Sequence, residues 1–350
     1  FAKSKFILLL DEMSRLEEAA TVANRIVRNF NAPFTLGSDE LVLNLNVGIA
    51  CYPISGESTL ELVRNASASL AFLDKASEKN AFHYYNEVID ARADERLKFE
   101  EHLEEAFKNE SLYLDYQPII DLDTQMLYGV EALLRWRSEE YGEVSPERII
   151  PIAEESGLIV DLGYWIIERV FQQYIEWQNT MRPFRVSINI TPRQLYDVTW
   201  RDTILALIKK YQIDPNFIIF ELTERDIFSD LDRTNEQLRE LAMLGCHLFI
   251  DDYGTGFSSI NLIRRLPISG LKIDKSFVQG VDHDPEDAGL VKSILDLADN
   301  LNLVVIAEGV EKESQLEFIQ SSSRGKKAQG FFFDRPMTPE AIQKRYSRAK

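Results

Sequence analysis

The stretch Phe217-Ile-Ile-Phe-Glu-Leu222 is a short apolar run that carries a carboxylate, Glu221, near its end. Apolar runs of about four to eight residues between helical segments are typical of buried strands. Such runs recur at 113–120, 127–134, 185–190, 217–222, 247–250, 270–273, 303–307 and 330–333. Strand candidates repeated over roughly 240 residues predict the α/β fold class, as a TIM-like (β/α)8 barrel. A doubly wound open sheet is the alternative, but it usually has a glycine-rich turn after its first strand, and the sequence has none there.

Polar side chains lie at or near the ends of these predicted strands. They are Glu131, Asn189, Glu221, Asp251, Asp252, Lys272, Glu308 and Gln329. The carboxyl ends of barrel strands open onto one shared face, so we expect these groups to converge there. A single acidic residue at a strand end is usually the N-cap of the following helix. Its repetition on successive strands favours a shared chemical site instead.

Carboxylates that converge in this way predict a metal site. Adjacent bare carboxylates raise one another's pKa and lose solvation, and a divalent cation resolves that conflict. Ligands that are all oxygen, without cysteine or histidine, favour Mg²⁺ or Mn²⁺ over Zn²⁺. The adjacent Asp251 and Asp252 could serve one or two ions, and a pair of ions holds the attacking and leaving oxygens in phosphoryl chemistry. Lys272 would orient the attacking water or neutralise developing charge.

The beginning of the chain predicts a second, smaller α/β domain. Apolar runs at 6–10, 41–51 and 81–85 are strand candidates, and helical spacing at 16–30 and 60–73 predicts two helices. We expect three parts: a small domain over 1–87, a connecting helix over 88–110 and the barrel over 111–350. Because the first run begins abruptly, we expect the chain to be a fragment of a longer protein.

Composition excludes several classes of function. With 39 basic and 57 acidic residues, the formal net charge is −18, which disfavours binding to DNA or RNA polymers and to an anionic bilayer. The 2 cysteines exclude a disulfide framework and a cysteine-rich zinc site. No apolar run reaches the roughly 20 residues that cross a bilayer. We expect a cytoplasmic protein, or the cytoplasmic part of a longer, membrane-anchored one.

The barrel region resembles the EAL domain family. The resemblance runs from about residue 112 to about residue 337 and rests on motifs in the family's order. They are Tyr116-Gln-Pro-Ile119, Gly129-Val-Glu-Ala-Leu-Leu-Arg-Trp136, Ser187-Ile-Asn-Ile-Thr-Pro192, Glu221-Leu-Thr-Glu224, Asp251-Asp-Tyr-Gly-Thr-Gly-Phe-Ser-Ser259, Leu271-Lys-Ile-Asp274, Ala307-Glu-Gly-Val-Glu311 and Gln329-Gly330. That family hydrolyses the bacterial messenger cyclic di-GMP to linear pGpG. The resemblance therefore implies a metal-dependent phosphodiesterase, on a barrel whose first strand is antiparallel.

The resemblance also implies roles for single residues. The metal ligands would be Glu131, Asn189, Glu221, Asp251 and Glu308, joined by Asp252 when a second ion is bound. The catalytic set would be Glu131, Asp252, Lys272 beside the nucleophilic water, and Glu308 as the general-base candidate. The substrate would be held by Gln117, Gln329 and Arg135, the last against a phosphate. Glu224 would anchor the loop that contains Gly254 and Gly256 as hinges, a loop that the family uses for dimerisation, so we expect a homodimer.

Residues 1–87 resemble the C-terminal part of a GGDEF domain, the diguanylate cyclase family that often precedes EAL. The best match is Asn46-Val-Gly-Ile-Ala-Cys-Tyr-Pro53. The family's signature would lie at Ala2-Lys-Ser-Lys-Phe6, where Ser4 and Lys5 replace the carboxylates that hold metal. GTP condensation is therefore chemically implausible, and we expect a regulatory or dimerisation role that serves an upstream sensory region outside this chain.

Other functions remain open at this point. The chain could be a non-enzymatic cyclic di-GMP receptor, a scaffold for a protein partner, or a magnesium barrel that acts on a carboxylate substrate. Receptors of this kind usually lose part of the set Glu131, Asp251 and Lys272, which is intact here. Arg135 could instead form only a surface salt bridge. Segment 321–328, with its basic stretch at 324–327, departs from the family pattern, and we expect it to be a solvated loop.

Overall fold

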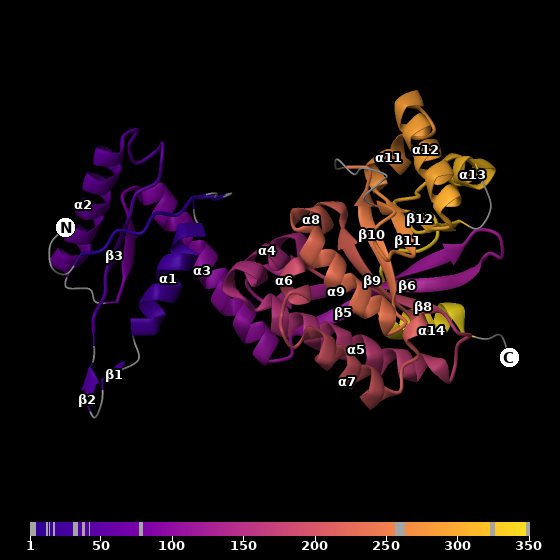
Figure 1. Cartoon of the computed structure of the whole chain (residues 1–350), viewed down its shortest axis with the longest axis horizontal. Helices are drawn as coiled ribbons and strands as arrows, with labels where there is room; N and C mark the ends of the chain where they lie inside the picture. The colour runs from indigo at the N-terminus through magenta and orange to yellow at the C-terminus, as the bar shows by residue number, and fades with distance from the viewer. Residues whose placement is uncertain are drawn as a thin grey trace. The chain divides into compact units, whose positions relative to one another are not determined.

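The computed structural model describes residues 5–11, 13, 15–16, 18–30, 34–36, 39–41, 43–76, 80–255, 263–322 and 326–347. The chain divides into two compact units, which Figure 1 colours from indigo to yellow along the sequence. The first unit comprises Phe1–Asn109 and Pro151–Gly157, and the second comprises Glu110–Ile150 and Leu158–Lys350. Each unit is described by itself.

The second unit is built on a closed barrel of eight strands. They are β5 (Leu112–Asp121), β6 (Met126–Ser138), β8 (Arg185–Asn189), β9 (Ile218–Thr223), β10 (His247–Tyr253), β11 (Gly270–Ile273), β12 (Val304–Ala307) and β13 (Lys327–Ala328). Their order is β5-β13-β12-β11-β10-β9-β8-β6, and pairing of β6 with β5 closes the ring. β5 is antiparallel to both neighbours, whereas the other ring pairs are parallel. The predicted barrel with an antiparallel first strand is confirmed.

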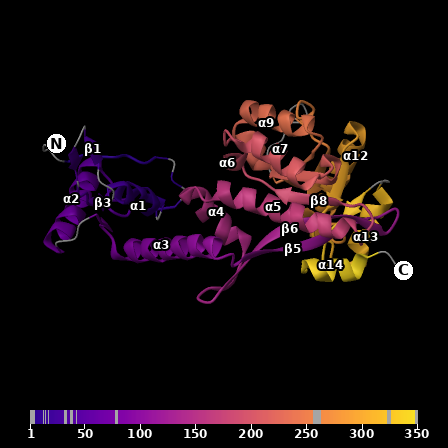
Figure 2. The same cartoon turned by 90° about the horizontal axis from the view of Figure 1, so that it is seen from below.

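Helices alternate with these strands along the chain. They are α4 (Pro146–Ser156), α5 (Ile159–Gln178), α6 (Pro192–Leu195), α7 (Trp200–Tyr211), α8 (Glu224–Ser229), α9 (Leu231–Met243), α11 (Lys275–Gly280), α12 (Pro285–Leu301), α13 (Glu313–Ser322) and α14 (Pro339–Tyr346). A 3-10 turn, η1 (Pro215–Phe217), precedes β9, and β7 (Gly142–Val144) extends the sheet beyond β6. Figures 1 and 2 show α5 and α7 side by side on one flank.

Local sequence sets the ends of these helices, as α12 illustrates. Its N-cap is Asp284, whose side chain accepts a hydrogen bond from the backbone N–H of Glu286, and Pro285 occupies the first turn. Asn302 ends the helix with φ of 55°, in the left-handed region that asparagine tolerates better than most residues. Residues close to each end in the sequence therefore determine where this helix begins and ends.

A layer of apolar side chains fills the barrel beneath the strand ends. Ile119, Ile219, Phe249 and Ile306 form one buried cluster. Successive side chains of a strand point to opposite faces, so the residue two positions later in each strand points the same way. Glu221, Asp251 and Glu308 therefore lie one layer above Ile219, Phe249 and Ile306, toward the carboxyl ends of the strands.

The first unit contains α1 (Glu18–Phe30), β1 (Phe34–Leu36), β2 (Asp39–Leu41), β3 (Val47–Ile49), α2 (Thr59–Ala76), β4 (Phe82–Tyr84) and α3 (Glu87–Lys108). β3 and β4 pair in parallel, and α1 packs against them through Ala19, Ala20 and Ala23. α3 occupies the place of the predicted connecting helix. Of the predicted strand over 41–51, Leu41 ends β2, which pairs with β1, and Val47–Ile49 form β3, which pairs with β4 over three residues.

The predicted strand over 6–10 is wrong. Residues 6–10 form no strand, and Phe6 and Leu9 are 92% and 84% exposed. Apolar character alone does not make a strand, because a strand also needs a neighbour for its backbone hydrogen bonds. Ala2 to Ser4, which belong to the expected GGDEF signature, lie outside the described residues.

The predicted strand over 330–333 is also wrong. The last strand is Lys327–Ala328, and residues 330–333 form a turn in which Phe331 and Phe332 are exposed. Gly330 packs backbone to backbone against Val310, since a Cβ at this position would lie 2.1 Å from the Val310 carbonyl oxygen.

The basic segment also differs from the expected solvated loop. Lys326 and Lys327 are buried, and Lys327 Nζ lies 2.7 Å from Asp121 Oδ2. The antiparallel pairing of β13 with the end of β5 brings Lys327 opposite Asp121, so the ammonium gains a partner on burial. Arg324 lies outside the described residues. Among the described helices, none is both long and apolar enough to cross a membrane.

Candidate functional site

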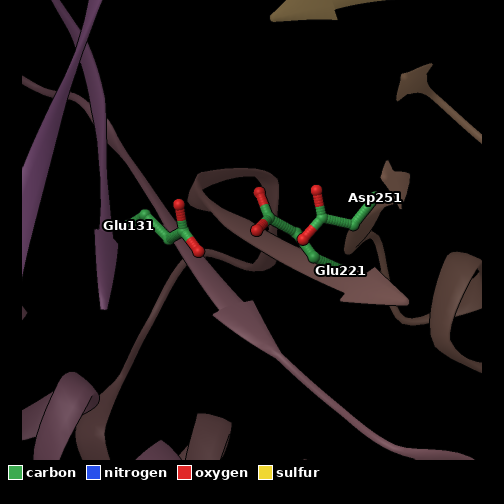
Figure 3. A group of neighbouring side chains, drawn as sticks. All are labelled: Glu131, Glu221 and Asp251. Atoms are coloured by element: carbon green, nitrogen blue, oxygen red, sulfur yellow. The ribbon is translucent and has the colours of Figure 1, made fainter. Parts of the chain in front are cut away.

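Four carboxylates surround one buried ammonium at the carboxyl ends of the strands. Lys272 Nζ lies 2.8 Å from Glu308 Oε1, 2.9 Å from Glu221 Oε2, 3.2 Å from Glu131 Oε2 and 3.3 Å from Asp251 Oδ1. These five residues come from β6, β9, β10, β11 and the position after β12. Figure 3 shows the carboxylates of Glu131, Glu221 and Asp251 near one another. The expected convergence of distant acidic residues is therefore present.

Three amide side chains complete the cluster around Glu131. Asn189 Nδ2 donates to Glu131 Oε1 over 2.7 Å, and Gln329 Nε2 donates to Glu131 Oε2 over 2.7 Å. The same Gln329 nitrogen lies 2.9 Å from Gln117 Oε1. Gln117, Asn189 and Gln329 thus join the carboxylates, although they come from β5, from β8 and from the residue after β13.

The donor set fits a hard divalent cation. Glu131, Glu221 and Asp251 each offer a carboxylate oxygen within 4.8 Å of the others, and so do Asp251, Asp252 and Glu308. Asp251 belongs to both groups, which is the arrangement that two neighbouring ions require. Glu221 Oε1 and Gln329 Oε1 are buried without a hydrogen-bond partner. A buried oxygen without a partner is costly, and a cation would satisfy it.

Burial and mutual repulsion shift the pKa values of these acids upward. Burial, reinforced by Glu131 and Asp251, raises the pKa of Glu221 to about 8, although Lys272 opposes the shift. Burial and the neighbouring Asp251 raise the pKa of Asp252 to about 6. Burial also raises the pKa of Glu308 well above its usual range. These carboxylates are therefore costly to ionise unless a cation accompanies them.

The pKa values of Glu131 and Lys272 are shifted in the directions that favour their charged forms. Burial opposes ionisation of Glu131, yet Lys272, Gln329 and Asn189 together hold its pKa below the usual range. Burial would lower the pKa of Lys272, but Asp251 and the other surrounding carboxylates raise it well above the usual value. The lysine is thus a permanent cation that partly neutralises the cluster.

The segment after β10 is held by Glu224. The backbone N–H of Gly254 donates to Glu224 Oε2 over 3.0 Å, and Glu224 is buried at the start of α8. Asp252, just before this point, has φ of 51°, a conformation uncommon for residues other than glycine. The anchoring role that the resemblance implies for Glu224 stays a prediction. Gly256 lies outside the described residues.

Arg135 lies on β6, four positions beyond Glu131, and forms a salt bridge. Its Nε lies 3.1 Å from Asp115 Oδ2, and its Nη1 donates to the carbonyl oxygen of Leu134. Sequence reasoning did not identify Asp115. The only signal was the antiparallel β5–β6 hairpin, in which Tyr113 pairs with Arg135 and Asp115 with Leu133.

Comparisons with known proteins place these motifs in a family context. Residues 100–336 match the family model described as the EAL domain, and residues 1–80 match that of the diguanylate cyclase, GGDEF domain. The bifunctional diguanylate cyclase/cyclic di-GMP phosphodiesterase MucR of Pseudomonas aeruginosa is 33% identical over 97% of this chain and 49% of its own length. The cyclic di-GMP phosphodiesterase PdeR of Escherichia coli is 33% identical over 98% of this chain and 51% of its own length. The chain spans about half the length of these curated relatives.

Two solved structures with a similar barrel contain nucleotides. The PaMucR phosphodiesterase in its c-di-GMP complex is 34% identical, covers 69% of this chain and 98% of that chain, and superposes with a TM-score of 0.66. The EAL enzyme Bd1971, in a form with cAMP and cyclic-di-GMP bound, is 29% identical over 84% of this chain and 77% of that chain, with a TM-score of 0.71.

Proposed function

The chain belongs to the EAL domain family, and from this premise we propose that it is a metal-dependent phosphodiesterase that hydrolyses cyclic di-GMP to linear pGpG. One observation carries the proposal: Glu131, Glu221, Asp251 and Glu308 meet within salt-bridge distance of a single ammonium. Relatives named for this activity, MucR and PdeR, align over nearly the whole chain, which supports the assignment.

Mg²⁺ or Mn²⁺ would be held by the oxygen donors of the cluster. The ligands would be Glu131, Asn189, Glu221, Asp251 and Glu308, with Asp252 added for a second ion. When bound, such ions polarise a phosphodiester and lower the pKa of coordinated water. The unpartnered Glu221 Oε1 supports this assignment, because it is a buried acceptor near the centre of the cluster.

The remaining groups would bind and orient the reactants. Glu308 would accept a proton from the attacking water, since its pKa is raised and it lies beside Lys272. Lys272 would hold that water and offset the charge that develops on the phosphate. Gln117 and Gln329 would hydrogen-bond the substrate at the edge of the cluster, and Arg135 would contact a phosphate from the rim.

The first unit would regulate or dimerise the protein rather than make the nucleotide. Lys5 and Phe6 occupy part of the expected signature, and no carboxylate stands at residues 2–6. We place the protein in the cytoplasm, as a homodimer whose barrel is controlled by its neighbouring domain. These assignments rest on the motifs and on the family.

A chelator experiment tests the proposed activity. Purified chain is incubated with cyclic di-GMP and Mg²⁺ or Mn²⁺, and products are separated by anion-exchange chromatography over time. We expect linear pGpG with either ion, no product with excess EDTA, and recovery when Mn²⁺ is added back. Glu131→Gln is the matched control, because it keeps the shape but removes the charge, and we expect it to bind nucleotide without turnover. Binding by the unaltered chain without any turnover would instead indicate a receptor.

A further inference from the structure

On the β5–β6 hairpin, polar side chains extend from the carboxylate cluster around Lys272 toward the carboxyl end of β6. In its ladder Gln117 pairs with Glu131, Asp115 with Leu133, and Tyr113 with Arg135. Leu112, Leu114 and Tyr116 of β5 are buried, whereas the positions between them are partly exposed. Ala132, Leu134 and Trp136 of β6 are likewise buried.

This alternation fixes which side chains share a face. Residues two apart in a strand point the same way, so Asp115 lies on the face of Gln117, and Arg135 lies on the face of Glu131. Gln117 and Glu131 both contact Gln329 within the cluster. Asp115 and Arg135 therefore stand on the same face as the cluster, farther along toward the carboxyl end of β6.

The Asp115–Arg135 contact is partly shielded from water. The two side chains are only 18% and 21% exposed, and the Nε–Oδ2 distance is 3.1 Å. The nearby pair of Arg137 and Glu143 is 76% and 55% exposed. An arginine has five N–H donors, and the contacts to Asp115 and Leu134 engage two of them. The remaining donors can meet a ligand while the side chain is held.

We propose that Asp115 is a positioning residue that holds the Arg135 guanidinium toward the phosphate of the substrate. The proposal rests on the proposed function, in which Arg135 contacts that phosphate. A free arginine on a rim samples many rotamers and loses that freedom when it binds a ligand, so prior fixation strengthens binding. The negative charge of Asp115 works in the opposite direction, because it repels a phosphate.

Two variants separate orientation from charge. Asp115→Ala removes both the acceptor and the charge, whereas Asp115→Asn keeps an acceptor for the Nε donor. In steady-state hydrolysis of cyclic di-GMP with Mn²⁺, we expect Asp115→Ala to raise KM roughly tenfold and to change kcat by less than about threefold. We expect Asp115→Asn to restore KM to within about threefold of the unaltered chain. If Asp115→Ala fails to fold, as judged by circular dichroism, Asp115→Ser replaces it.

Controls on neighbouring residues test the specificity of the effect. Glu143→Gln breaks the exposed ion pair with Arg137 on the adjoining strands, and we expect an unchanged KM. Adding Asp115→Ala to Arg135→Ala should raise KM no further, because the positioned group is already gone. An unchanged or lower KM for Asp115→Ala, or an Asp115→Asn variant as impaired as Asp115→Ala, would overturn the proposal.

The same series distinguishes this proposal from the one on which it rests. If Arg135→Ala itself leaves KM unchanged, the substrate-binding role assigned to Arg135 fails and the positioning role fails with it. If Arg135→Ala raises KM but Asp115→Ala does not, only the positioning role fails. If no variant or unaltered chain hydrolyses the nucleotide, the proposed function itself fails.

Discussion

At the scale of the residue, Lys272 supplies the positive charge that offsets the buried carboxylates of the site. Its ammonium is fully buried and is the shared partner of Glu131, Glu221, Asp251 and Glu308. A buried carboxylate without a cation is strongly unfavourable. The lysine therefore stabilises the fold when no metal is bound, and bound metal would take over part of that role.

Lys272→Ala should accordingly destabilise the metal-free protein. In EDTA we expect a loss of about 3–5 kcal/mol in the free energy of unfolding, the usual result of removing one partner of a buried ion pair. Excess Mn²⁺ should recover part of the loss, since the ion supplies the missing charge. Thermal unfolding with and without Mn²⁺ measures both effects. Lys312→Ala, which breaks the exposed pair with Asp282, is the control and should cost below about 1 kcal/mol. Equal stability of Lys272→Ala and the unaltered chain in EDTA would contradict this account.

The raised pKa values predict that metal affinity depends on pH. A ligand must be ionised to bind metal, and Glu221 and Asp252 have pKa values of about 8 and about 6. As the pH falls through these values, each carboxylate takes up a proton that metal must displace. Apparent affinity for Mn²⁺ should therefore rise between about pH 5.5 and about pH 8.5. Calorimetry at three pH values, in buffers of different ionisation enthalpy, gives the affinity and the protons released. Affinity that stays constant over this range would show that the acids are already ionised.

At the scale of the element, backbone hydrogen bonds join the end of β12 and the residues after it to the residues that follow β13. The backbone N–H of Gln329 donates to the carbonyl oxygen of Ala307. In the same way, the N–H of Val310 donates to the carbonyl oxygen of Gln329, and the N–H of Phe332 donates to that of Val310. Gly330 makes this approach possible, because a Cβ would lie 2.3 Å from Val310 N. The contact positions two site residues, Glu308 and Gln329, relative to each other.

Gly330→Ala should disturb both stability and activity. The added Cβ must push the two segments apart, and we expect a loss of about 1–3 kcal/mol in unfolding free energy, as for other overpacked sites. Hydrolysis should fall as Glu308 and Gln329 move. Gly289→Ala in α12 is the matched control: nothing lies within 4 Å of its Cβ position, so its stability should stay equal or rise. Denaturant unfolding and initial rates check both variants, and a fully active, equally stable Gly330→Ala would disprove the packing argument.

At the scale of the whole molecule, segments distant in sequence belong to one packed unit. Pro151–Gly157, which covers the end of α4 and the residue after it, clusters with the first unit, where Arg96 of α3 pairs with Glu155. Arg96 is 9% exposed in its side chain, whereas Arg28, which pairs with Glu101 and Glu104, is 43% exposed. The partly buried pair of Arg96 and Glu155 therefore contributes more to the stability of this unit than the exposed contacts of Arg28.

Arg96→Ala should destabilise the first unit more than Arg28→Ala does. We expect a loss of roughly 2–3 kcal/mol for Arg96, between the values typical of exposed and buried pairs, because Glu155 loses its partner. For Arg28 we expect less than about 1 kcal/mol. Hydrogen exchange followed by mass spectrometry should show faster exchange in α3 and in residues 151–157 for Arg96→Ala alone. Equal effects of the two variants would contradict this ranking.

Much of the barrel and its candidate site could be predicted from the sequence, because each step is local. Apolar runs mark strands, and an acidic residue two positions after an inward apolar residue must point toward the mouth, as Glu221 does after Ile219. The predictions were wrong where contacts with another segment of the chain determine the backbone conformation. The aromatic run at 331–333 is apolar enough for a strand, but the backbone contact of Gly330 with Val310 makes it a turn.

The positions of polar residues at the ends of the predicted strands were enough to identify the candidate site residues. The reason is that parallel strands of a barrel have their carboxyl ends at one face. It did not determine which groups touch. Only closure of the ring placed the Lys272 ammonium among four carboxylates, and only the register of the β5–β6 hairpin set Asp115 beside Arg135. Periodicity is a property of short segments, whereas contact distances depend on how segments far apart in the chain are packed together.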